Sequence, residues 1–144
     1  MKVTADPVPE HQDAPPAKIE LKFPAGIIGF PEHARGEIFH FAEQLPFQWL
    51  RLHGPTLLHF VVIDPLSVVP DYAPELYAED AKALGIVDAA DAVVFSIVTV
   101  RDQGDTTINL VGPIIANRHT GAARQVVIAN YNQYNARHAL ITAP

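Results

Sequence analysis

Proline is the feature of this sequence that most limits its fold. The chain has 144 residues and thirteen prolines, roughly twice the usual share of about 5%. Eight of them punctuate its middle: Pro24, Pro31, Pro46, Pro55, Pro65, Pro70, Pro74 and Pro113. Because a proline inside a helix costs about 3 kcal/mol, this spacing excludes a bundle of long helices. The spacing is instead compatible with short strands and helices joined by turns that contain proline.

Length and composition narrow the class further. A chain of this length predicts one domain, which we place at residues 18–144. Residues 1–17 contain four prolines and almost no large apolar side chain, which predicts a flexible N-terminal arm. The absence of cysteine excludes disulfides and thiolate zinc sites. Without a long apolar run or a signal-peptide pattern, we expect a soluble, cytoplasmic protein with no membrane contact.

Alternating and β-branched runs predict eight short strands. They lie at 18–23, 37–42, 47–52, 57–63, 93–100, 106–110, 114–117 and 124–129. Apolar periodicity predicts one helix at 74–84, with Gly85 placed to end it, and Asp88 is placed to cap a further short turn. Residues 130–144 fit either an edge strand or a short helix. The fold class is therefore all-β and mainly antiparallel, a small sandwich or barrel with one or two short helices.

Charge is unevenly distributed along the chain. The net charge is -2 over residues 1–63, -7 over 64–105 and +3 over 106–144. Affinity for nucleic acid comes from Lys and Arg that displace counterions from phosphates. The acidic middle therefore argues against direct binding to nucleic acid.

No catalytic or metal-binding pattern stands out. The seven histidines show neither H-x-H nor H-E-x-x-H spacing, so we predict no metal site and no cofactor. The two serines, Ser67 and Ser96, lie outside any nucleophile motif, and Ser96 is expected in the core. These residues give no reason to predict an enzyme, but they leave that possibility open. The alternative is a small β-barrel ligand-binding domain or enzyme that uses its surface histidines.

An ordered series of motifs covers about three quarters of the chain, from Ile19 to Ile128. After the first strand it comprises G-I-I-G-F-P-E at 26–32, P-F-Q-W-L at 46–50, F-V-V-I-D-P at 60–65, P-D-Y at 70–72, I-V-T-V at 97–100, N-L-V-G-P-I-I-A-N at 109–117 and Q-V-V-I at 125–128. In this series the sequence resembles the flagellar assembly factor family, FliW. It departs from the family pattern at L-H-G (52–54), where Leu-Gln-Ser is usual, and at Gly112, where alanine is usual.

The resemblance implies a function that composition does not show. Proteins of this family are not enzymes, and they bind flagellin in the cytoplasm. Once flagellin is exported they are free to bind the translational regulator CsrA outside its RNA groove, which relieves repression of flagellin mRNA. The family fold is a small, strongly bent, barrel-like sheet with short helices, in agreement with the strand pattern.

Nine residues are candidates for binding these partners: Asp71, Tyr72, Glu75, Glu79, Asp80, Asn109, Pro113, Asn117 and Gln125. Tyr72 lies in a loop and fits either an interface anchor or the core. The asparagines fit either partner contacts or caps of turns. As a hypothesis, the acidic residues beside the helix repel RNA phosphates from a bound CsrA. The polar, cationic tail from Arg118 onward is either a second face for flagellin or a solvated tail.

Overall fold

The computed structural model describes residues 18–101 and 104–140 of the chain. The flexible arm predicted for residues 1–17 therefore lies outside the described residues, as do the last four residues of the tail. Within the described ranges the fold is a mostly antiparallel β-sheet with one α-helix, which confirms the predicted class. All eight prolines of the middle of the chain lie outside the strands, as their missing N–H groups require.

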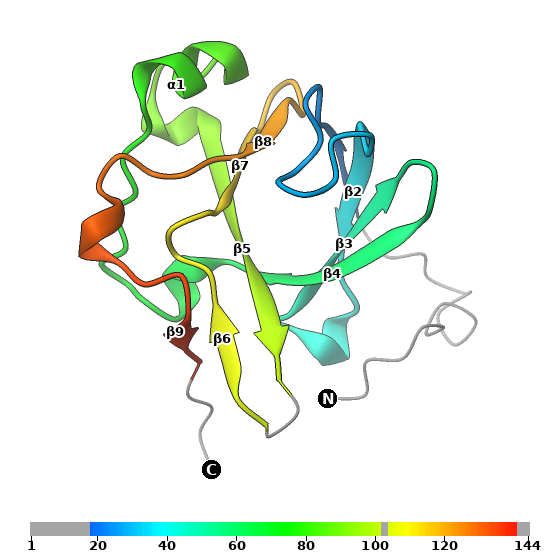
Figure 1. Ribbon diagram of the computed structural model, residues 1–144, viewed down its shortest axis with the longest axis vertical. Coiled ribbons are helices and arrows are strands. Elements are labelled where there is room, and N and C mark those ends of the chain that lie inside the picture. Colours follow the sequence, from blue (N-terminus) through cyan, green and yellow to red (C-terminus); the bar gives the residue numbers. More distant parts are fainter. Residues whose placement is uncertain (1–17, 102–103, 141–144) are drawn as a thin grey trace.

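The strands follow one another around a strongly bent sheet (Figure 1). They are β1 (Lys18–Lys22), β2 (Arg35–Phe39), β3 (Gln48–His53), β4 (Leu58–Ile63), β5 (Ala92–Val100), β6 (Thr106–Ile108), β7 (Ile114–Asn117), β8 (Ala123–Gln125) and β9 (His138–Ala139). The helix α1 spans Ala78–Leu84, and four short 3-10 helices are η2 (Ala42–Gln44), η3 (Pro65–Ser67), η4 (Ala89–Asp91) and η5 (Tyr131–Gln133).

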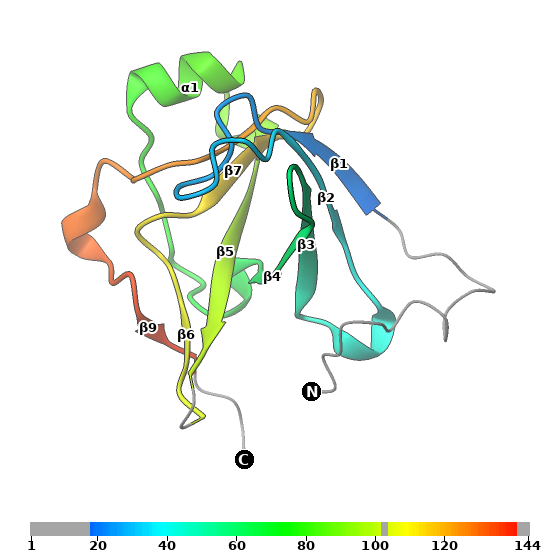
Figure 2. The same ribbon diagram turned by 45° about the vertical axis from the view of Figure 1, so that its right-hand side comes forward.

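The long strand β5 joins the two parts of the sheet. Its residues 92–95 pair with β7, whereas residues 96–98 pair with β4 and residues 98–100 with β6. In Figure 2, β1 to β3 form one wall and β5 to β7 the other. The predicted central strand 57–63 is confirmed, because β4 pairs with both β3 and β5.

The two walls meet again at the end of β1 without closing the sheet. Lys22 forms a single parallel bridge with Ala122, and its N–H donates to the carbonyl of Gly121 at 2.8 Å. Gly121 has φ of +79°, and a Cβ there would lie 2.6 Å from the carbonyl oxygen of Glu20. Only glycine combines this backbone conformation with so close an approach of two chains.

Two apolar clusters flank the β5–β7 wall. The first packs between the walls: Leu21, Phe23, Ile27, Ile38, Leu50, Leu52, Val62, Phe95, Ile114, Ala116 and Ala123. The second packs under α1 and the C-terminal segment: Ile63, Tyr72, Leu84, Val98, Ile108, Leu110, Ile115, Val126 and Ile128. Ser96 is fully buried, as predicted from its place in an apolar strand. Because the β5–β7 wall is packed on both faces, it provides a rigid base for the segments around α1.

Three elements differ from their predicted bounds by three residues or more. The helix predicted at 74–84 begins only at Ala78, because the backbone of Glu75 bonds to Ala129 and Asn130 rather than to a helical turn. The strand predicted at 37–42 lies at 35–39, since η2 begins at Ala42. The strand predicted at 124–129 ends at Gln125, although irregular pairing with the 109–113 loop continues it. The tail forms both η5 and the edge strand β9.

Candidate protein-binding surface

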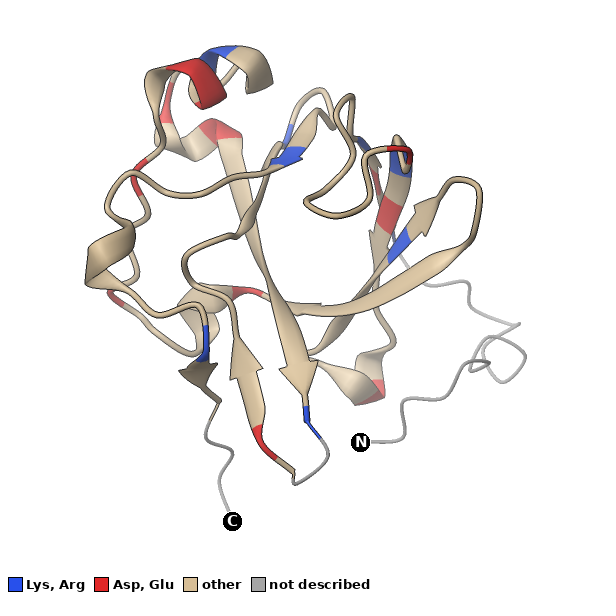
Figure 3. Ribbon diagram, in the orientation of Figure 1, with Lys and Arg blue, Asp and Glu red and all other residues tan. Residues whose placement is uncertain are grey.

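We call residues 71–80 the acidic segment; it leads into α1, where acidic residues gather at one end of the molecule (Figure 3). Glu75 and Glu79 are exposed, and so is Asp71, which precedes them in the sequence. Asp80 differs, because its carboxylate pairs with the Arg124 guanidinium of β8 at 2.9 Å. The predicted acidic group is therefore brought together, but Asp80 also ties α1 to the sheet.

Asn117 holds the end of α1 against the sheet. Gly85 ends the helix with φ of +68°, as predicted. The Asn117 side-chain NH₂ donates to the carbonyls of Leu84 and Gly85 at 2.9 and 3.2 Å. Its Oδ1 accepts from the N–H groups of His119 and Thr120 at 2.8 and 3.2 Å. The predicted turn cap is thus also a cap for the helix, and the residue is buried.

Asn130 positions the exposed Glu75 from the opposite side. Its Oδ1 accepts from the N–H of Glu75 at 2.8 Å, and its NH₂ donates to the carbonyl of Ala73 at 2.9 Å. The N–H of Ala129 donates to the carbonyl of Glu75 at 2.7 Å. Sequence reasoning missed this role, because a single asparagine in an amide-rich tail carries no spacing signal.

Tyr72 is a core residue rather than an exposed anchor, so the interface alternative for its ring is wrong. It is 5% exposed, and its hydroxyl donates to the carbonyl of Leu110 at 2.6 Å. Burial raises the pKa of Tyr72 far above its ordinary value. The exposed aromatic rings in and beside the acidic segment are instead Tyr77, 44% exposed before α1, and Tyr131, 53% exposed in η5.

Asn109 and Gln125 are half-buried and organise the loop between β6 and β7 through bonds to backbone groups. Asn109 Oδ1 accepts from the N–H groups of Val111 and Gly112 at 3.0 and 2.8 Å, an Asx turn. Gln125 donates to the carbonyl of Gly112 at 3.0 Å and accepts from the N–H of Ile28 at 3.1 Å. Pro113 is buried beside them. These motif residues hold two loops together.

A buried ionic group on β2 and β3 was not predicted. Glu37 is 7% exposed and accepts from Arg51 Nη2 at 2.9 Å and from His53 Nε2 at 2.7 Å. Burial alone raises the pKa of Glu37, but the hydrogen bonds from His53 and Arg51 outweigh it and hold the pKa below its ordinary value. Charged residues on alternating strand positions are usually solvent-facing, so the sequence pattern does not predict that these three residues pair.

The histidines are dispersed over the part of the chain that the structure describes. Among those residues, no group of three or more His, Asp or Glu side chains converges as metal ligands would. His33 Nε2 lies 2.8 Å from the carbonyl of Thr56, and His119 Nε2 lies 3.0 Å from Asp91. Three of the described histidines, His33, His53 and His119, make separate local contacts.

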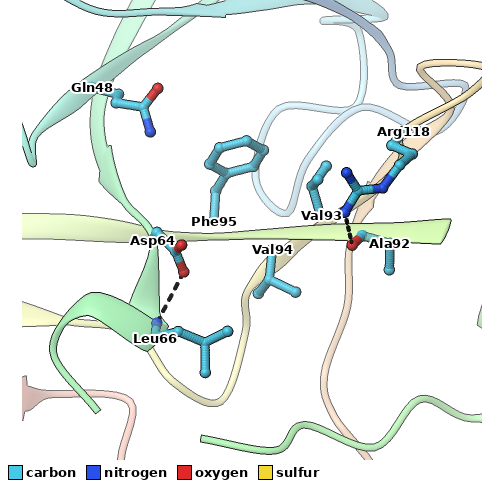
Figure 4. Close-up of a pocket in the computed structure, with 8 residues that line it drawn as sticks. All are labelled: Gln48, Asp64, Leu66, Ala92, Val93, Val94, Phe95 and Arg118. Carbon is cyan, nitrogen blue, oxygen red and sulfur yellow. Dashed lines mark hydrogen bonds between the residues drawn. The ribbon is translucent and has the colours of Figure 1, made fainter. Parts of the chain in front are cut away.

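A groove of about 240 Å³ lies along the first half of β5 (Figure 4). Val93 and Phe95 line it on one side of the strand and Val94 on the other, with Asp64 near one end and Arg118 near the other.

In the described ranges, no helix is long and apolar enough to cross a membrane.

Known proteins resemble this chain in sequence and in fold. The family model described as FliW protein matches residues 8–140. The chain is 33% identical over 129 residues to the flagellar assembly factor FliW of Heliobacterium modesticaldum, which covers 89% of this chain and 84% of that protein. It is 38% identical over 124 residues to the FliW of Moorella thermoacetica, covering 83% and 77%.

A crystal structure of the flagellar assembly factor FliW superposes with a TM-score of 0.70 at 32% identity, covering 84% of this chain and 83% of that one. The proteins of this family are assembly factors and not enzymes, as the motif series implied. With its motifs, its bent sheet and the match over 8–140, the chain belongs to the FliW family of flagellar assembly factors.

Proposed function

We propose that this protein binds flagellin in the cytoplasm and, when free of flagellin, binds CsrA and relieves the repression of flagellin mRNA. The observation that carries the proposal is the exposed acidic surface around α1, held in place by buried asparagines, in a chain of the FliW family. A fixed charged surface without a catalytic site suits recognition of another protein.

The acidic surface also offers a way to act on RNA without touching it. Glu75 and Glu79 are exposed and have Tyr77 between them, a large ring for protein contact. Phosphates brought within a Debye length of about 8 Å would be repelled by these carboxylates. A bound CsrA would then lose RNA through repulsion in addition to any change in its own shape.

Size-exclusion chromatography of the purified protein mixed with CsrA, with flagellin and with both tests the binding. We expect a stable complex with each partner alone, and less CsrA complex when flagellin is added. Elution of all three proteins as independent peaks at micromolar concentration would contradict the proposal.

The double variant Glu75→Gln, Glu79→Gln tests the repulsion. It leaves Asp80 in place, because Asp80 pairs with Arg124. We expect CsrA binding to remain while displacement of RNA weakens and loses its salt dependence. The matched control is Glu20→Gln, Glu32→Gln, which removes the same charge at exposed positions outside the acidic segment. Unchanged RNA displacement in the first variant would refute electrostatic exclusion.

The polar tail is proposed as a flagellin-binding face, and the structure changes how it should be tested. Deleting 131–144 would remove β9, which pairs with β6, and would break the bond from the Leu140 N–H to the carbonyl of Thr106. Tyr131→Ser is the cleaner change, since this ring is exposed. We expect weaker flagellin binding with unchanged stability. Flagellin affinity equal to that of the unmodified protein would argue for a merely solvated tail.

A further inference from the structure

The first half of β5 has a free edge. Residues 92–95 pair with β7 on one side, whereas β4 pairs only with residues 96–98. The chain leaves the sheet at Asp64 and turns into η3, with the Asp64 side chain accepting from the N–H of Leu66 at 3.0 Å. Among the described residues no strand takes the place that β4 vacates.

The register shows which backbone groups line this edge. The N–H of Arg118 donates to the carbonyl of Asp91 at 2.8 Å, so among the backbone carbonyl groups of this segment that of Asp91 points toward β7. Because these groups alternate along an antiparallel strand, Val93 and Phe95 also point toward β7. Ala92 and Val94 therefore point to the free edge. In agreement, Arg118 Nη2 reaches the carbonyl of Ala92 from the groove at 3.4 Å (Figure 4).

The groove beside this edge suits an extended chain in shape and polarity. Its walls carry Val93 and Phe95 on one face of β5, and Val94 and Leu66 on the other. Side chains of an added strand alternate between two faces, so both sets would meet apolar surface. Arg118 already donates to the Ala92 carbonyl, so the main-chain bonds of an added strand would centre on Val94. A single apolar ligand would leave these bonds unused.

The course of β4 gives the direction of the bound chain, and the charges at the two ends of the groove indicate which residues suit each end of that chain. A strand that continues the course of β4 runs antiparallel to β5, from Phe95 toward Ala92. Its N-terminal end then meets the Asp64 carboxylate and its C-terminal end meets the Arg118 guanidinium. We propose that this groove binds an extended segment of a partner polypeptide by strand addition, with a basic residue before and an acidic residue after a short β-branched run. This site does not rest on the proposed function.

The test uses the full chain and the peptide acetyl-Lys-Val-Thr-Val-Thr-Glu-amide, followed by amide chemical shifts. We expect saturable binding below about 1 mM, with the largest shifts at residues 92–95. Two further peptides carry N-methyl groups on alternate residues, one on each edge of the strand. One pattern should weaken binding at least about tenfold and the other little, because only one edge faces β5. Equal effects of the two patterns, or no binding, would overturn the proposal.

Charge provides the second arm of the test. Asp64→Asn keeps an acceptor for the Leu66 N–H but removes the charge. We expect it to weaken the Lys peptide about threefold and to leave a Gln-for-Lys peptide unaffected, as fits a rim charge pair. A peptide with its terminal charges exchanged should bind more weakly to the unmodified protein. The opposite ranking would overturn the assigned direction.

Other occupants of the edge would show themselves before any peptide is added. Slow hydrogen exchange of the Val94 amide in the dilute free protein would mean that this chain covers its own edge. Protection that rises with protein concentration would mean that a second copy does. Either result would overturn the assignment to a partner polypeptide, while leaving the flagellin and CsrA proposal untouched.

Discussion

Replacing Asn117 by alanine should loosen the acidic end of the molecule and destabilise the whole fold. The side chain is 5% exposed and makes four hydrogen bonds to backbone groups. Two of these bonds satisfy the last carbonyls of α1, and two satisfy the turn after β7. The side chain thus links two segments that lie more than 30 residues apart in sequence.

The magnitude follows from what the substitution leaves unpaired. The bond to the Leu84 carbonyl is buried, and a buried acceptor without a partner costs about 1–3 kcal/mol. The other three bonds are partly accessible to water, so their loss adds a few tenths of a kcal/mol each. We expect a loss of about 2–4 kcal/mol in the free energy of unfolding, a large part of the usual 5–15 kcal/mol.

Urea unfolding followed by tryptophan fluorescence measures this loss directly, because Trp49 is the only tryptophan in the chain. Asn132→Ala in η5 is the matched control, since Asn132 is exposed and should change stability by less than about 0.5 kcal/mol. Asn117→Asp retains the two acceptor bonds but places a negative charge against the helix carbonyls, so at pH 7 it should be no more stable than the alanine variant. A loss below about 1 kcal/mol for Asn117→Ala would refute the reasoning.

Three other changes have definite expected outcomes. Gly121→Ala forces a Cβ to 2.6 Å from the Glu20 carbonyl at positive φ, and thermal unfolding should show a loss of about 2–4 kcal/mol. The pKa of Glu37 in the folded protein lies below its ordinary value of 4.5. Its contribution to the free energy of unfolding is therefore present above pH 4.5 and is lost as the pH falls through the folded pKa. In urea unfolding measured at a series of pH values, Glu37→Gln should weaken the loss of stability on the acid side. Tyr72→Phe leaves the Leu110 carbonyl unpaired, and urea unfolding should report a loss of about 1–3 kcal/mol.

The sequence predicted the strands better than the site, and the reason is physical. Strand patterns such as 57–63 depend on local alternation and β-branched side chains, which one short window contains. The start of α1 depends instead on Asn130, about fifty residues away, which holds Glu75 in an extended segment. The same holds for Glu37, because its partners come from the neighbouring strand. Contacts between segments that are far apart in the chain produce no repeating pattern in the sequence, so such a pattern cannot predict them.

The candidate residues form two groups: some bond to the backbone of this chain, and others are exposed to solvent. Asn109, Asn117 and Gln125 come from the motifs that identify the family, yet their polar atoms bond to backbone within this chain. A motif residue of this kind has a role in folding, and substituting it should lower stability. Glu75 and Glu79 lie outside those motifs and face solvent. Exchanging Glu75 and Glu79 should therefore change partner recognition with little effect on the fold, whereas exchanging the three amides should change the fold itself.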